Sequence, residues 1–117
     1  MDDGERSCLA RYVEVLEKRL GGELEEIVVF GSVARGEAWP RGMRIRSDLD
    51  LLVVTRSQVS AETEDELIHA TMPLFLECGR QLGPHFRTRE SLERPNDERD
   101  ASFVANVERD GITIYRR

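Results

Sequence analysis

The sequence predicts a single α/β (α+β) domain over residues 1–117, in which a small β-sheet is flanked by helices. Three observations predict it. Helical and strand patterns alternate along the chain in the order α-β-α-β-α-β-α-β. The connections are short, and no repeat or low-complexity tract interrupts them. A chain of this length also holds enough residues for one modest core. Periodicity alone leaves open whether the sheet is mixed or fully parallel.

The first half of the chain predicts a helix, a strand and a second short helix. Residues 7–20 carry apolar side chains at spacings of three and four, with Ser7 as a start signal and Gly21-Gly22 as an end. Residues 25–30 form the first strand. A short helix should follow Ser32, and residues 37–47 then form a loop that contains the single tryptophan, Trp39.

The second half begins with a strand over residues 48–54 whose two faces are both apolar, which is typical of a central strand covered on both sides. A long helical stretch over residues 61–82 should be kinked or restarted at Pro73. A short strand over residues 85–88 follows. The last elements are a helix over residues 98–109 and a strand over residues 112–115.

The composition excludes some classes of protein. The net charge of −6 argues against a nucleic-acid partner, because phosphate backbones attract basic surfaces. No apolar run is long enough to span a membrane, and the acidic N-terminus is unlike a secretory signal. Cys8 and Cys78 are far apart in the sequence and predict neither a metal site nor a disulfide framework. We therefore expect a cytoplasmic protein.

The candidate site is expected at the end of the first strand and the start of the second, which residues 31–48 connect. The apolar strand ending at Phe30 continues into Gly31-Ser32, a turn and helix start whose N–H groups can bind phosphate oxygens. Asp48 and Asp50 stand at i and i+2 of the next strand, so their carboxylates share one face. Paired carboxylates are ligands that Mg²⁺ prefers. These residues predict a site for a Mg²⁺-bound nucleoside triphosphate.

Each candidate also has a structural interpretation. Gly31-Ser32 can be an ordinary turn with a serine cap. Asp48 can cap a loop, and Asp50 can be a paired structural carboxylate, although a central apolar strand is a poor place for an unpartnered charge. Arg35 can contact phosphate or pair with an aspartate. His69 and His85 have no metal-ligand spacing and are interpreted as ordinary residues.

The pattern Gly31-Ser32-x15-Asp48-x-Asp50, with Arg35-Gly36 after the turn, resembles the DNA polymerase beta-type nucleotidyltransferase superfamily. It is similar in particular to the small minimal nucleotidyltransferase (MNT) proteins. The resemblance implies a small mixed sheet. It also implies transfer of a nucleoside monophosphate, AMP if the substrate is ATP, to a hydroxyl of a separate acceptor. Asp48 and Asp50 would then be the catalytic metal ligands, and Gly31, Ser32 and Arg35 would bind the nucleotide.

The chain departs from this superfamily in one respect. Members usually carry a third carboxylate on a later strand, where it helps hold the catalytic metal. The strand predicted over residues 85–88 contains no Asp or Glu, and Glu77 and Glu90 lie outside it. Nucleotide binding is therefore better supported than fast catalysis. The alternative function is a nucleotide-binding antitoxin or regulatory module with little or no catalysis.

The resemblance also implies a partner, because MNT proteins are commonly paired with a helical HEPN-type protein that some of them adenylylate. We expect such a partner or a homodimer. The expected contact surfaces are the Trp39 loop and the apolar side of the helix around Phe103 and Val107. The alternative is that Phe103 and Val107 face their own core. The sequence does not identify the acceptor.

Overall fold

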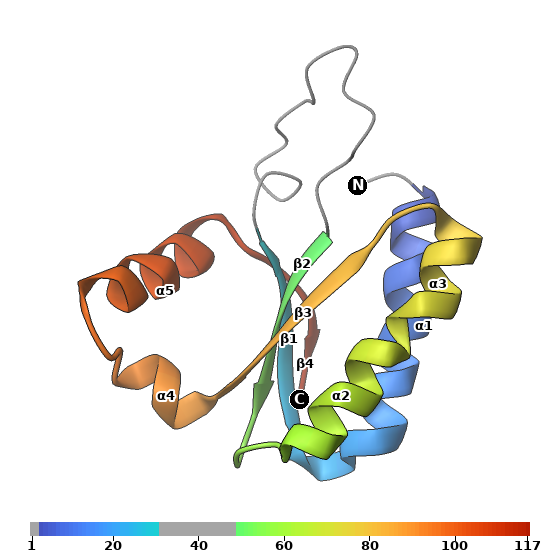
Figure 1. The fold of residues 1–117 in the computed structure, drawn as a ribbon. Helices are drawn as coiled ribbons and strands as arrows, with labels where there is room; N and C mark the ends of the chain where they lie inside the picture. Colours follow the sequence, from blue (N-terminus) through green and yellow to red (C-terminus); the bar gives the residue numbers. More distant parts are fainter. Residues whose placement is uncertain (1–2, 31–48) are drawn as a thin grey trace.

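The fold is a four-stranded mixed sheet with helices on both faces (Figure 1). The computed structural model describes residues 3–30 and 49–117. The elements are α1 (Asp3–Leu20), the 3₁₀ turn η1 (Gly21–Glu23), β1 (Leu24–Phe30), β2 (Leu49–Thr55), α2 (Ala61–His69), α3 (Thr71–Cys78), β3 (Leu82–Thr88), α4 (Arg89–Glu93), α5 (Glu98–Asp110) and β4 (Ile112–Arg116). The strand order is β3-β2-β1-β4. β3 runs parallel to β2, whereas β1 pairs antiparallel with β2 and β4, so the mixed sheet is confirmed.

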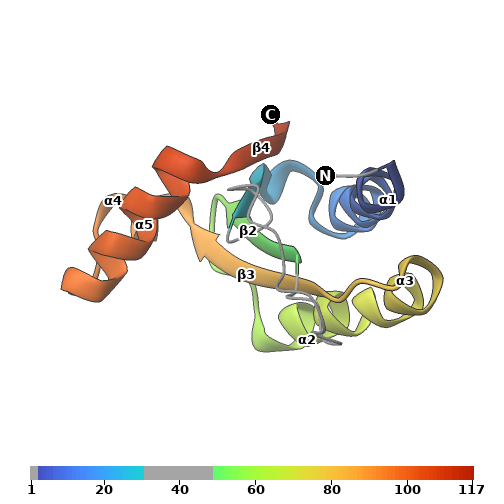
Figure 2. The ribbon, with the colours of Figure 1, turned by 90° about the horizontal axis from the view of Figure 1, so that it is seen from above.

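The two faces of the sheet are covered by different helices. α1, α2 and α3 lie on one face, and α4 and α5 lie on the other (Figures 1 and 2). Alternating side chains of β2 follow this division. Leu51 and Val53 are buried in the larger core with α1, whereas Leu52 and Val54 form a smaller core with Val107 of α5. The prediction of a central strand covered on both faces is confirmed.

Most predicted elements are found, with four differences. The predicted 61–82 helix is two helices, which meet at Ala70, and Pro73 lies in the first turn of α3, where its missing N–H breaks no helical bond. β3 begins at Leu82 instead of residue 85, and α4 was not predicted. α1 begins at Asp3, so Ser7 is inside the helix and does not cap it. The predicted helix after Ser32 and the 37–47 loop lie outside the described residues.

A disulfide between Cys8 and Cys78 corrects the sequence-based expectation that none forms. The two cysteines are separated by 70 residues in the sequence, yet their Cα atoms lie 6.2 Å apart because α1 packs against α3. Sequence spacing could not reveal this contact. Disulfides are rare in cytosolic proteins, so one ground for the cytoplasmic expectation is removed. In the described ranges, no helix is long and apolar enough to cross a membrane.

Tyr12 fixes α1 against α2 within the same core. Its side chain is fully buried, and its hydroxyl donates a 2.8 Å hydrogen bond to the carbonyl oxygen of Leu67. Burial raises the pKa of the Tyr12 hydroxyl, which keeps it a neutral donor. The disulfide and this hydrogen bond therefore attach α1 to α3 and α2 at two separate points.

We expect reduction of the Cys8–Cys78 bond to lower the free energy of unfolding by about 2–4 kcal/mol, because the bond closes a long loop in the unfolded chain. Urea unfolding with and without a thiol reductant measures this effect. The Cys8→Ala/Cys78→Ala variant is the matched control and should be insensitive to reductant. Two free thiols in the untreated protein, or equal unfolding midpoints in both conditions, would contradict the prediction.

Candidate functional site at the end of the β1–β2 pair

The described part of the chain contains one of the five predicted site residues, Asp50. Gly31, Ser32, Arg35 and Asp48 lie outside the described residues. The strands that flank them are described, and Phe30 at the end of β1 pairs with Asp50 of β2. The chain therefore leaves and re-enters the sheet at adjacent positions at one end of it (Figure 1).

Asp50 is close to a histidine of the neighbouring strand. The Asp50 Oδ1 atom lies 3.6 Å from the Nε2 atom of His85 on β3. The side chains are 35% and 53% exposed, respectively, so both reach solvent. The interpretation of His85 as an ordinary residue missed this contact, because it depends on the parallel pairing of β2 with β3, in which Leu52 aligns with His85.

Phe30 connects this pair to α5. Its ring centroid lies 5.5 Å from that of His85, with the rings tilted by 54°. The same Phe30 ring meets Phe103 of α5 edge-on at 5.3 Å. Phe103 packs against the smaller core, and Val107 is buried in it. Of the two interpretations of this helix, the structure supports the one in which Phe103 and Val107 face their own core. The larger exposed apolar side chains of the described ranges are Ile68, Met72, Phe75, Leu76 and Ile112.

Among the described residues, the possible metal donors at this end of the sheet are the Asp50 carboxylate and the His85 imidazole. Among the described residues, no three His, Cys, Asp or Glu side chains come together as a metal-binding group. Glu77 pairs with Arg11, and Glu90 pairs with Arg94, so neither is placed as a third carboxylate beside Asp50. Asp50 and His85 can contribute two ligands to a cation, and further ligands would have to come from outside the described ranges or from the nucleotide.

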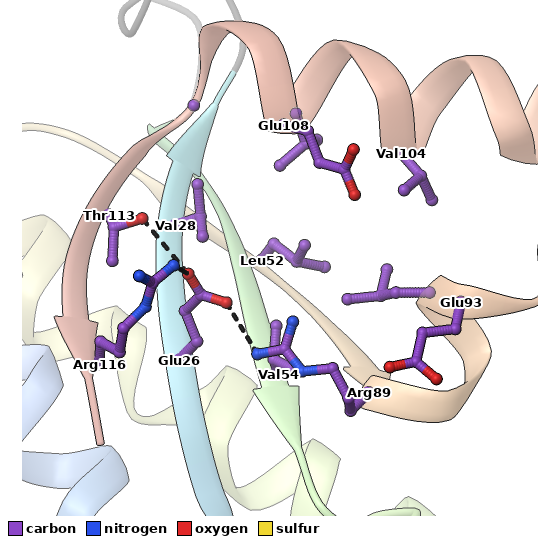
Figure 3. A pocket seen from close by; sticks show the side chains of 13 residues that line it. Glu26, Val28, Leu52, Val54, Arg89, Glu93, Val104, Glu108, Thr113 and Arg116 are labelled. Carbon is purple, nitrogen blue, oxygen red and sulfur yellow. Dashed lines mark hydrogen bonds and ion pairs between the residues drawn. The ribbon is translucent and has the colours of Figure 1, made fainter.

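A hollow of ≈ 410 Å³ lies elsewhere on the same face of the sheet, beside α5 (Figure 3). Its apolar lining is Val28, Leu52, Val54, Leu92, Val104 and Val107. Charged side chains from β1, α4, α5 and β4 surround this lining. Neither Asp50 nor His85 lines the hollow, so it is separate from the candidate site.

Glu26 is the buried carboxylate of this hollow, and its hydrogen bonds indicate a structural role. Arg89 and Arg116 each donate a 2.8 Å hydrogen bond to a different oxygen of Glu26 (Figure 3). Thr113 donates a longer one at 3.3 Å. Burial acts to raise the pKa of Glu26, but the hydrogen bonds from Arg89 and Arg116 outweigh it and lower the pKa. Glu26 therefore stays ionised and links β1 to α4 and β4.

Comparisons with known proteins agree with this architecture. The family model of the nucleotidyltransferase domain matches residues 9–107. A crystal structure of a mutant toxin–antitoxin complex, MntA–HpeT, is similar with a TM-score of 0.61 and 16% identity over 93% of this chain and 72% of that chain. A Shewanella oneidensis structure of a tri-AMPylated HEPN toxin with its MNT antitoxin has a TM-score of 0.57 and 13% identity, over 96% and 72%. At identities of 16% and 13%, these two comparisons show that the fold of this chain is similar, and nothing further.

A third solved structure, assigned as a minimal nucleotidyltransferase, shares 29% identity with a TM-score of 0.51, over 92% of each chain. No curated protein matches the sequence.

We expect Glu26→Gln to lower the free energy of unfolding by about 1–2 kcal/mol at neutral pH, because two charge-assisted hydrogen bonds weaken while the arginines can turn to solvent. The native pKa of Glu26 is lowered, so its stabilising effect is present above the unfolded-state value of about 4.3 and is lost as pH falls through the native value. The difference in free energy of unfolding between the wild type and Glu26→Gln should therefore shrink below about pH 4.

Urea unfolding between pH 7 and pH 3 measures this difference. Glu90→Gln is the control, because Glu90 is exposed and pairs within one helical turn with Arg94. Equal losses for the Glu26 and Glu90 variants, or a difference that stays constant with pH, would show that Glu26 is not a linking carboxylate.

Proposed function

Because the chain belongs to the nucleotidyltransferase domain family, we propose that it binds a nucleoside triphosphate at the Asp50 end of the sheet and transfers its nucleoside monophosphate to an acceptor hydroxyl. One observation carries the proposal. Asp50 lies beside Phe30, the residue from which the chain continues into Gly31-Ser32. The Asp50 carboxylate therefore lies at the partly exposed end of the sheet where the chain enters the segment that we propose binds phosphate.

The proposed roles follow from the chemistry of each side chain. Asp48 and Asp50, which stand at i and i+2 of the predicted strand, would hold Mg²⁺. Gly31 would let the backbone approach the phosphates, and Ser32 would donate a hydrogen bond to them. Arg35 would neutralise phosphate charge. When bound, the cation would supply charge neutralisation at the triphosphate.

The proposed reaction is an in-line displacement at the α-phosphorus. A bond forms between the acceptor oxygen and the α-phosphorus, and the bond from that phosphorus to the oxygen bridging it to the β-phosphate breaks. Pyrophosphate leaves, and the hydroxyl proton passes to solvent. Little covalent chemistry is required of the protein, so its residues act by positioning the two reactants and by neutralising charge. ATP is the proposed donor, with AMP as the transferred group.

The acceptor we propose is a HEPN-type protein. The structures of similar fold include an MNT antitoxin in complex with a tri-AMPylated HEPN toxin and a toxin–antitoxin complex with AMP-PNP. They support by analogy a protein acceptor and an adenine nucleotide for this chain. We place this activity in the cytoplasm, and a homodimer is the alternative assembly.

A second candidate function is a nucleotide-binding antitoxin that occupies its partner with little or no transfer. One observation favours it: the described ranges hold no third carboxylate grouped with Asp50. The two functions share the nucleotide site and the partner, and they differ only in whether AMP is transferred. Detection of AMP on the partner therefore distinguishes them.

Titration calorimetry with Mg²⁺-ATP should detect binding by the wild type, and Asp50→Asn should weaken it at least about tenfold, because the cation loses a charged ligand. Asp65→Asn is the matched control, since Asp65 is an exposed residue of α2 on a different part of the fold. The control should bind like the wild type. The site assignment fails if the wild type does not bind, or if the Asp48→Asn/Asp50→Asn variant binds equally well.

Purification from the native source should yield a complex, and light scattering should give a mass above that of one 13.4 kDa chain. With ATP labelled at the α-phosphate, label should appear on the co-purified protein, and it should be absent with ATP labelled at the γ-phosphate. The Asp48→Asn/Asp50→Asn variant should remove it. A complex that forms without any label would favour the binding function, and a monomer with no co-purifying protein would contradict both.

A further inference from the structure

His85 is the residue that the sequence analysis set aside and that the fold brings to the candidate site. Its Nε2 atom lies 3.6 Å from Asp50 Oδ1, and both side chains lie on the same face of the sheet. We propose that His85 is a nitrogen ligand of the cation at this site, acting together with Asp50. This inference rests on the proposed function and names one of the residues that would complete its metal site.

The distance between the two atoms is slightly longer than that between two ligands of one cation. A hydrogen bond between a ring nitrogen and a carboxylate oxygen is about 2.7–3.2 Å long, and 3.6 Å exceeds it. Two ligands each about 2.1 Å from a shared ion lie roughly 3.0–3.4 Å apart in octahedral or tetrahedral geometry. Because the Asp50 side chain is partly exposed, a small rotation of that side chain would bring the two atoms to this separation.

The surroundings of His85 restrict how it can move. β3 is hydrogen-bonded to β2 along its length, so the backbone of His85 is fixed relative to Asp50. The Phe30 ring lies against the imidazole, and Phe103 of α5 supports Phe30 from its edge. A ligand held by a rigid strand and a packed ring is partly preorganised for binding. With this packing, the Nε2 atom of His85 lies 3.6 Å from Oδ1 of Asp50.

A nitrogen ligand changes the preferred metal. Carboxylate and phosphate oxygens suit Mg²⁺ and Mn²⁺, whereas imidazole favours later first-row metals such as Ni²⁺. If His85 binds the ion, the wild type should bind nucleotide more tightly with Ni²⁺ than with Mg²⁺. His85→Asp should remove most of this preference, because an all-oxygen site results. If His85 only contacts Asp50, the variant should leave the metal preference unchanged.

The direct test is electron–nuclear double resonance on ¹⁵N-labelled protein with Mn²⁺ and unlabelled AMP-PNP, which separates protein nitrogen from nucleotide nitrogen. We expect a directly bonded ¹⁵N coupling in the wild type and its loss in His85→Gln. The chain has two histidines, so His69→Gln is the matched control and should keep the coupling. Urea unfolding checks that both variants remain folded.

The outcomes separate the two proposals. Absence of any Mn²⁺–nucleotide binding by the wild type overturns the proposed function and this inference with it. Binding without a ¹⁵N coupling, or a coupling that survives in folded His85→Gln, overturns the assignment of His85 and leaves the proposed function standing.

Discussion

The antiparallel pairing of β1 with β2 is the constraint on which the rest of this structure depends. It sets Phe30 opposite Asp50, so that the chain leaves and re-enters the sheet at one end. It also places both strands at the centre of the sheet, where each buries side chains on two faces. The apolar character of these strands makes a carboxylate among them costly unless it is solvated or partnered. Asp50 meets this condition because it stands at the exposed end of β2, beside His85.

The two faces of the sheet support this end differently. On one face, the Cys8–Cys78 bond and the Tyr12 hydrogen bond attach α1 to α3 and α2. On the other face, the ionised Glu26 links β1 to α4 and β4, and α5 packs over the smaller core. Phe30 and Phe103 continue this packing up to the candidate site. Glu26 is buried and accepts three hydrogen bonds, as a structural carboxylate should. Asp50, the candidate metal ligand, is partly exposed, which leaves it accessible to a ligand.

The sequence predicted three of the four strands closely, because local patterns determine them. The limits of β1 and β4 and the C-terminal end of β2 differ from the predicted ones by one residue at most, since short apolar runs bounded by turn residues mark these strands. The Cys8–Cys78 disulfide and the contact between His85 and Asp50 were missed, because both depend on the packing of elements distant in sequence. The family was predicted from a resemblance carried by a few residues, and it is confirmed by the domain match. The roles of Gly31, Ser32, Arg35, Asp48 and Asp50 remain predictions.

The central claim is that nucleotide binds at the Asp50 end of the sheet. Amide chemical shifts of ¹⁵N-labelled protein, followed during titration with Mg²⁺ and AMP-PNP, test it most directly. The account predicts saturable shift changes at Phe30, Asp50 and His85, with little change in α2 or at Glu26. Changes concentrated at Glu26 and Arg89, with none at Asp50, would place the ligand in the hollow beside α5 and contradict the claim.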